Sequence, residues 1–128
     1  STLNCYVVSN IDYKFYISAV PVILKSQETY NVSKGKPLAV KVVYYTLPDA
    51  NSITLIASSD SYKTNLHNKT SNVSIQTTFH GQSVTVDGKV LTITTDNVLE
   101  SNFDTRFTIL LENEIGNATS EFIIQPKG

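Results

Sequence analysis

The feature of this sequence that most constrains its fold is a period-two alternation of apolar and polar residues, which recurs in short runs along the chain. Successive side chains of a β-strand point to opposite faces of a sheet, so each run describes a half-buried strand. Gly, Pro, Asn and Asp separate the runs, and no segment shows the apolar spacing of an amphipathic helix. The chain is therefore predicted to be all-β.

The runs follow one another at intervals of about 10 residues, a spacing typical of antiparallel sandwiches. A single sheet with this much alternating apolar surface needs a second sheet to cover it. We expect strands at 38–44, from Ile53, around 73–77 and 91–93, and at 107–111 and 122–124. A long loop is expected over 58–71, with one short edge strand within it as the alternative, and a turn is expected at Asp87-Gly88.

An internal repeat bears on domain organisation. The first residues, through Leu24, parallel the last hairpin of the chain: an alternating strand, an Asn-containing turn, a second alternating strand and then a proline. A length of 128 residues is enough for one well-filled core. We therefore predict that residues 1–20 are the C-terminal hairpin of a preceding domain and that residues 21–128 form a complete domain, with the boundary near Ala19–Pro21.

Charge and side-chain chemistry argue against several classes of function. Ten Lys and Arg residues oppose eleven Asp and Glu, so there is no electrostatic case for a nucleic acid or an anionic membrane as partner. No apolar run approaches the roughly 18 residues of a membrane span, so no direct membrane insertion is expected. The lone Cys5 cannot form an internal disulfide or a metal site. His67 and His80 have no nucleophile or carboxylate placed beside them, so neither an enzyme nor a cofactor is expected.

The stretch RFTILLENEIG at 106–116 carries a resemblance to a known family. Immunoglobulin domains show a late-strand pattern Tyr-x-Cys-x-(Ala/Val)-x-Asn-x-x-Gly. The residues in register with it here are Phe107, Ile109, Leu111, Asn113 and Gly116. The resemblance is to the intermediate set and covers about residues 20–126. It implies a two-sheet antiparallel immunoglobulin-like β-sandwich with Greek-key topology.

The departures from the family pattern form a consistent set. Val42 and Ile109 occupy the places of the two disulfide cysteines, and Leu55 occupies that of the core tryptophan. We expect these three side chains to meet as an apolar core pin between the sheets. Each burial is worth about 1.5–3 kcal/mol, comparable with the roughly 2–4 kcal/mol of a disulfide. The resemblance also implies that Cys5 pairs with an upstream cysteine of the preceding domain, outside this chain.

Asparagine glycosylation signals point to a location. Asn-x-Ser/Thr sequons begin at Asn31, Asn68, Asn72 and Asn117. Asn117 is expected in the last hairpin turn and Asn68 in the long loop, where a glycan could project. Together with the inferred role of Cys5, the sequons favour an extracellular chain, either the cell-surface ectodomain of a single-pass membrane protein or a secreted protein.

The resemblance implies a protein-binding module of a multi-domain cell-surface adhesion molecule or receptor ectodomain, recognising another protein or a copy of itself. Its partners would bind through sheet faces or loops, and neighbouring immunoglobulin-like domains would flank it. The expected contact residues are the exposed alternates of the late hairpin, Thr108, Leu110, Glu112 and Glu114, because Leu110 should point outward. An intracellular structural module of a giant muscle-type filament protein is the alternative, which the missing core cysteines favour and the sequons oppose.

Overall fold

The computed structural model describes residues 6–11, 14–50 and 52–127. Strands account for most of this structure, and the only helical segments among the described residues are short 3-10 turns. In chain order the elements are β1 (Tyr6–Ile11), β2 (Lys14–Lys25), β3 (Thr29–Val32), β4 (Leu38–Leu47), β5 (Ser52–Ile56), η1 (Asp60–Lys63), β6 (His67–Phe79), β7 (Gln82–Thr95), η2 (Glu100–Asn102), β8 (Arg106–Glu112) and β9 (Asn117–Pro126).

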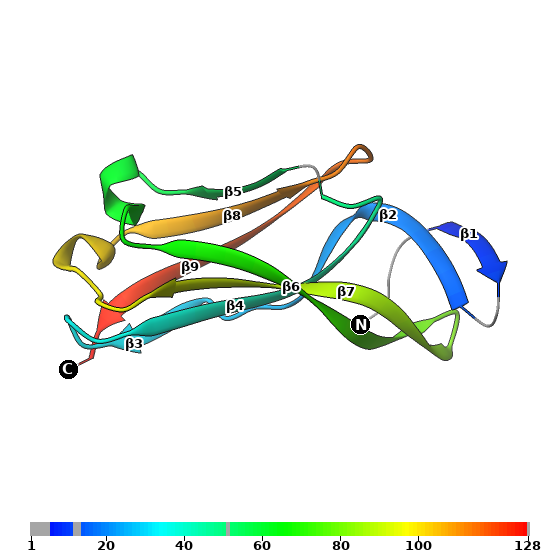
Figure 1. The fold of residues 1–128 in the computed structure, drawn as a ribbon, viewed down its shortest axis with the longest axis horizontal. Helices are drawn as coiled ribbons and strands as arrows, with labels where there is room; N and C mark the ends of the chain where they lie inside the picture. Colours follow the sequence, from blue (N-terminus) through cyan, green and yellow to red (C-terminus); the bar gives the residue numbers. More distant parts are fainter. Residues whose placement is uncertain (1–5, 12–13, 51, 128) are drawn as a thin grey trace.

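The strands form two sheets that face each other, as Figure 1 shows. A five-stranded sheet has the order β1-β2-β4-β7-β6, and a four-stranded sheet has the order β3-β9-β8-β5. Strands distant in the sequence are neighbours in space, such as β4 with β7 and β5 with β8, as expected of a Greek key. The predicted two-sheet sandwich is confirmed, with one parallel pair, β3 and β9, among antiparallel ones.

The core lies between the two sheets, and the alternation of the sequence decides which residues fill it. In β8, Phe107, Ile109 and Leu111 are each 1% exposed or less, while the residues between them point outward. Phe107 stacks on Phe122 of β9 with ring centroids 5.1 Å apart. The other buried members of this main core are Val40, Val42, Tyr44, Leu91, Ile93, Val98, Phe103 and Ile124.

The expected turn at Asp87-Gly88 is wrong, because β7 runs through both residues. The hairpin turn lies instead at His80 and Gly81, which have φ values of 51° and 77° and connect Phe79 to its partner Gln82. Positive φ at both central residues matches the twist of the flanking strands. Gly88 serves a different purpose: a Cβ atom there would collide with Ile75 and lie 3.0 Å from the carbonyl oxygen of Tyr44.

The loop expected over 58–71 is shorter than predicted, because the edge strand β6 begins at His67, so the alternative of an edge strand within this stretch agrees with the structure. A short helical turn, η1, occupies the middle of the shorter connection. Side chains from this connection are tied to η2: Asn65 and Asn102 exchange hydrogen bonds of 2.9 and 3.0 Å through their amide groups. These two hydrogen bonds hold the connection against η2, so it does not project freely into solvent.

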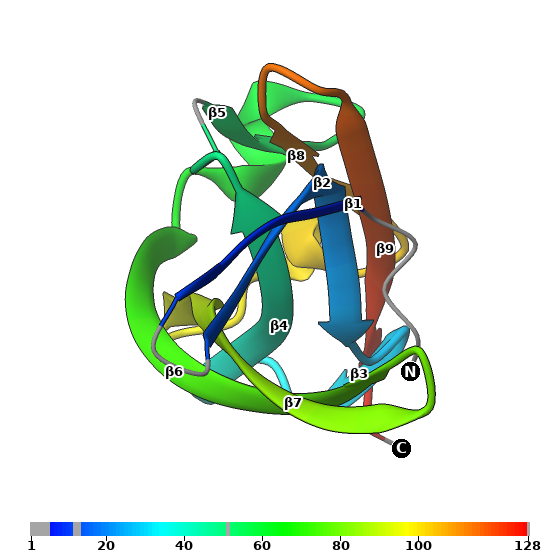
Figure 2. The same cartoon turned by 90° about the vertical axis from the view of Figure 1, so that its right-hand side faces the viewer.

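A second apolar cluster lies on the outward face of the five-stranded sheet. Its buried members are Tyr45, Val84 and Val86. The buried face of β7 thus changes along the strand, from Val84 and Val86 on one side to Leu91 and Ile93 on the other, with Gly88 between them. In Figure 2 the β6–β7 hairpin curls below the sandwich, and β1 and β2 lie above the hairpin.

The N-terminal hairpin continues the five-stranded sheet. β1 pairs with β2, and β2 runs without interruption through Ala19–Pro21 to pair with β4. The assignment of residues 1–20 to a preceding domain stays a prediction, and Cys5 lies outside the described residues. Within the ranges that the structure describes, no helix has the length and apolar character needed to cross a membrane.

Candidate protein-binding face

The outward face of the four-stranded sheet carries the predicted contact residues of β8. Thr108, Leu110 and Glu112 alternate with the buried core residues and lie on this face, each half-buried. Glu114 is exposed and follows the end of the strand, in the turn. The structure therefore places three of the predicted contact residues on one sheet surface and the fourth beyond its end.

Leu110 is half-buried rather than fully exposed because its neighbours flank it. Thr54 of β5 and Thr119 of β9 stand directly opposite Leu110 on either side. In the next row Ile56, which is 43% exposed, pairs with Thr108. Leu110 on the central strand β8 and Ile56 at the end of the edge strand β5 thus form an apolar pair on this face, with threonines beside it.

The ends of this face are polar. At one end Arg106 and Glu121 form an ion pair with 3.1 Å between Nη1 and Oε1. At the other end Glu112 stands opposite Asn117, the first residue of β9. Because both ion-pair partners are solvent-exposed, the pair contributes at most about 1 kcal/mol to stability. Its larger effect is to place charged side chains at the end of the face, next to the apolar residues Leu110 and Ile56.

Asn113 shapes the turn next to this face, a role the sequence did not reveal. Its side chain is buried, and Oδ1 accepts hydrogen bonds from the backbone N–H groups of Ile115 (2.9 Å) and Gly116 (3.0 Å). Its Nδ2 donates to Thr46 Oγ1 (3.1 Å) and to the carbonyl oxygen of Pro48 (3.3 Å). The Asn-x-x-Gly pattern was a signal for the local turn, but the link to the end of β4 spans the two sheets.

The residues of the predicted core pin lie in or against the main core. Val42 is 2% exposed and Ile109 is 1% exposed, whereas Leu55 is half-buried and packs against the same cluster. Leu55 and Ile109 are direct partners across β5 and β8. That the three residues do the work of a disulfide and a tryptophan stays a prediction. Phe107, which stands in the place of the tyrosine that begins the family's late-strand pattern, is fully buried.

Each sequon asparagine is exposed. Asn31 lies in β3 and Asn117 begins β9 just after the turn, while Asn68 and Asn72 lie on β6. The expectations that Asn68 sits in a loop and that Asn117 sits in the hairpin turn are therefore wrong. Asn72 Oδ1 accepts a hydrogen bond of 2.8 Å from Lys89 Nζ, which leaves the amide nitrogen, the atom to which a glycan is attached, outside that contact. Use of these sites stays a prediction.

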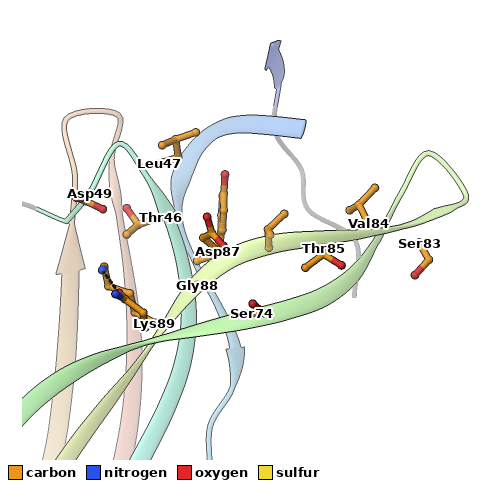
Figure 3. A pocket seen from close by; sticks show the side chains of 13 residues that line it. Thr46, Leu47, Asp49, Ser74, Ser83, Val84, Thr85, Asp87, Gly88 and Lys89 are labelled. Carbon is orange, nitrogen blue, oxygen red and sulfur yellow. Dashed lines mark hydrogen bonds between the residues drawn. The ribbon is translucent and has the colours of Figure 1, made fainter. Parts of the chain in front are cut away.

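A groove of about 600 Å³ opens on the five-stranded sheet. Figure 3 shows that its lining comes from the end of β4, from β6 and from β7. Tyr45 and Val86 supply apolar surface, and Asp49, Asp87 and Lys89 supply charge. The described residues contain no group of three or more His, Cys, Asp and Glu side chains able to hold a metal ion. His67 and His80 lie at the start of β6 and in the hairpin turn beyond its end, and neither lines the groove.

Comparisons with known proteins agree with this architecture. No family model and no curated protein matches the sequence. Similar solved structures include titin M4, at 14% identity with 88% of this chain and 100% of that chain covered and a TM-score of 0.60. A chimeric titin Z1Z2 carrying an exogenous decorin peptide has 13% identity, 86% and 96% coverage and a TM-score of 0.59.

A complex of Dpr2 Ig1-Ig2 with DIP-Theta Ig1-Ig3 is also similar, at 8% identity with 85% of this chain and 33% of that chain covered and a TM-score of 0.56. Identities this low establish shared architecture and nothing finer. The sheet order, the parallel pairing of β3 with β9 and these likenesses agree, and the chain is an immunoglobulin-like β-sandwich domain.

Proposed function

We propose that this domain is a protein-binding module of a multi-domain cell-surface adhesion molecule or receptor ectodomain, and that it binds through the outward face of the four-stranded sheet. The observation that carries the proposal is the apolar pair Leu110 and Ile56 on the outward face, which has threonines beside it and charged residues at both ends of the face. Similar structures include two in which immunoglobulin domains are in complex, Dpr2 with DIP-Theta and titin M10 with obscurin-like 1.

The sequons refine where a partner would sit. Asn117 stands opposite Glu112, so a glycan on Asn117 would cover the end of the face that Glu112 and Glu114 occupy. The centre of the face carries no sequon. We therefore assign the main contacts to Thr108, Leu110 and Ile56, with Glu112 and Glu114 at the margin.

The alternative is an intracellular structural module of a giant muscle-type filament protein. Two observations favour it: aliphatic residues fill both core cysteine positions, Val42 and Ile109, and several of the similar structures are titin domains. Against it stand the exposed sequon asparagines, which have no use in a compartment without glycosylation.

Two measurements test the proposal. In protein expressed through a secretory pathway, enzymatic deglycosylation should lower the mass; no shift at any sequon would overturn the extracellular assignment. Binding is then screened on an array of purified cell-surface ectodomains that includes this chain.

Leu110→Glu should weaken any interaction found by at least about tenfold, since it buries a charge at the centre of the face. Val43→Glu is the matched control, because Val43 is also a half-buried aliphatic residue on a central strand, β4. Equal binding by Leu110→Glu and the wild type would refute the assignment of the face.

A further inference from the structure

The edge of the five-stranded sheet formed by β6 has no partner strand among the described residues. β6 is 13 residues long and pairs with β7 over its whole length without a register shift. Its other side therefore presents a long row of backbone N–H and C=O groups that no described strand takes up, which is a template for another strand. Figures 1 and 2 show β6 on the outside of the molecule.

β6 has few of the devices that usually protect such an edge. It contains no proline, its pairing shows no bulge, and Lys69 is its only side chain charged at neutral pH with histidine uncharged. The other edge strands are much shorter: β1 has 6 residues, β3 has 4 and β5 has 5. Among the described strands, β6 is thus the edge best suited to add a partner.

The sequence of β6 is compatible with a second copy of itself. Val73 is the midpoint of the strand, so two antiparallel copies in full overlap set Val73 opposite Val73 of the second copy. In that register Lys69 faces Thr77, and no two like charges are opposed. Val73 and Ile75 are half-buried, and Ile75 packs against the second apolar cluster. Pairing would cover both side chains and continue that cluster across the two-fold axis.

Asn68 and Asn72 lie on this same strand, on the face opposite Val73 and Ile75. In the paired arrangement Asn72 stands opposite Ser74 of the second copy. The two Asn72 residues are then diagonal neighbours, about 7–8 Å apart. Glycans are bulky, so two of them attached at this distance would crowd each other and oppose pairing.

We propose that β6 is a strand-pairing site for a second copy of this chain, joined antiparallel about Val73, and that N-glycans on the same face of this strand, chiefly the one on Asn72, keep this edge closed. The pairing is independent of the proposed binding face, whereas the glycan control rests on the extracellular assignment. Protein that lacks these glycans would join two five-stranded sheets into one continuous sheet.

The pairing is tested on protein made without glycans in a bacterial cytoplasm, with Cys5→Ser to remove the thiol. Sedimentation velocity over a concentration series should show a monomer–dimer equilibrium. Val73→Lys places two ammonium groups opposite each other and should raise the dissociation constant about tenfold or more. Thr29→Lys adds the same charge to the edge strand β3, away from both proposed surfaces, and should leave the equilibrium unchanged. A monomer at every concentration, or equal effects of the two substitutions, overturns the pairing.

A cross-link tests the register without relying on charge. Residues directly opposite in an antiparallel pair have Cα atoms about 4.5–5.5 Å apart, within reach of a disulfide. Val73→Cys in the Cys5→Ser background should therefore oxidise to a covalent dimer, and Thr29→Cys on β3 should not. Thermal melts of all variants, measured in parallel, test whether each is folded. Failure of Val73→Cys to cross-link while wild-type protein dimerises would place the contact elsewhere.

The glycan control is tested on protein from a secretory pathway. This glycoprotein should be monomeric, and Asn68→Gln with Asn72→Gln should restore the dimer. Asn31→Gln with Asn117→Gln, which removes the sequons on the other sheet, should not. The glycan control is overturned if protein that carries glycans on both Asn68 and Asn72 still dimerises. It is also overturned if neither asparagine carries a glycan. Leu110→Glu should leave the dimer formed through β6 intact. The experiments therefore separate an error in the strand-pairing proposal from an error in the proposed binding face.

Discussion

Ile109 and Leu110 are adjacent in β8 but point to opposite sides of the sheet, which makes them a matched pair for a stability test. Ile109 is 1% exposed in the main core, and Leu110 is half-buried on the outward face. Replacing either with alanine removes three carbon atoms. For Ile109→Ala, about 0.8 kcal/mol per carbon gives roughly 2.4 kcal/mol, and the cavity raises the loss to about 3–4 kcal/mol.

For Leu110→Ala the loss should stay near 1 kcal/mol, because solvent and the flanking threonines reach the site. The free energies of unfolding are measured by urea titration, followed by circular dichroism or by the fluorescence of the 7 tyrosines, since the chain has no tryptophan. Domains of this size are stable by only about 5–15 kcal/mol, so a loss of 3–4 kcal/mol shifts the midpoint clearly. Similar losses for the two variants would refute the assignment of the core face.

The same titration tests the core pin. Val42 belongs to the same buried cluster as Ile109. If the two side chains support each other across the sheets, the double variant Val42→Ala/Ile109→Ala should depart from additivity by about 0.5 kcal/mol or more. Additive losses would mean that the two residues stabilise the fold independently and do not replace the disulfide as a unit.

Three further variants test other parts of the fold. Gly88→Ala should cost about 1–3 kcal/mol in a thermal or urea melt, because its Cβ would lie 2.8 Å from Ile75 Cγ1 and 3.0 Å from the Tyr44 carbonyl oxygen; an unchanged melt would show that β7 can shift there. Asn113→Ala should cost about 2–3 kcal/mol, because it leaves the turn amides and Thr46 without their buried partner; a loss below that of an exposed site would contradict the role given to Asn113. The Tyr44 hydroxyl is buried and has no hydrogen-bond partner among the described residues, so Tyr44→Phe should leave stability unchanged or raise it by about 1 kcal/mol. Burial, and then the charge of Asp49, raises the pKa of the Tyr44 phenol above 10.0, so the folded state holds this proton more tightly than the unfolded chain. The corresponding stability is present below about pH 10 and is lost as pH rises through the raised pKa, and Tyr44→Phe should flatten this alkaline decline in urea melts; an unaltered decline would contradict it.

The sequence predicted the core-facing strands well because burial of one face produces an alternation of apolar and polar residues along the strand. In β4 and β8 one face meets the opposite sheet and the other meets solvent or neighbouring side chains, so Val40, Val42, Ile109 and Leu111 alternate with outward residues. The pattern predicted these faces without any knowledge of the partner sheet.

The edge strand β6 shows almost no such alternation. Most of its side chains are exposed on both faces, so the polar run from His67 to Ser71 looks like a loop in the sequence. The turn that precedes β7 was misplaced for a related reason. Asp87-Gly88 has the composition of a hairpin turn, but Gly88 is required by the close approach of Ile75 and Tyr44, which only the packed structure reveals.

By itself, then, the sequence determined the all-β class, the inward faces of the central strands and the sequon positions, because each depends on side chains close together along the chain. The tertiary structure decided the length of β6, the flanking of Leu110 by Thr54 and Thr119, and the anchoring of Asn113 to Thr46. These features join segments distant in the sequence. They are stabilised by contacts between strands, and no local pattern of residues predicts which strands will be neighbours.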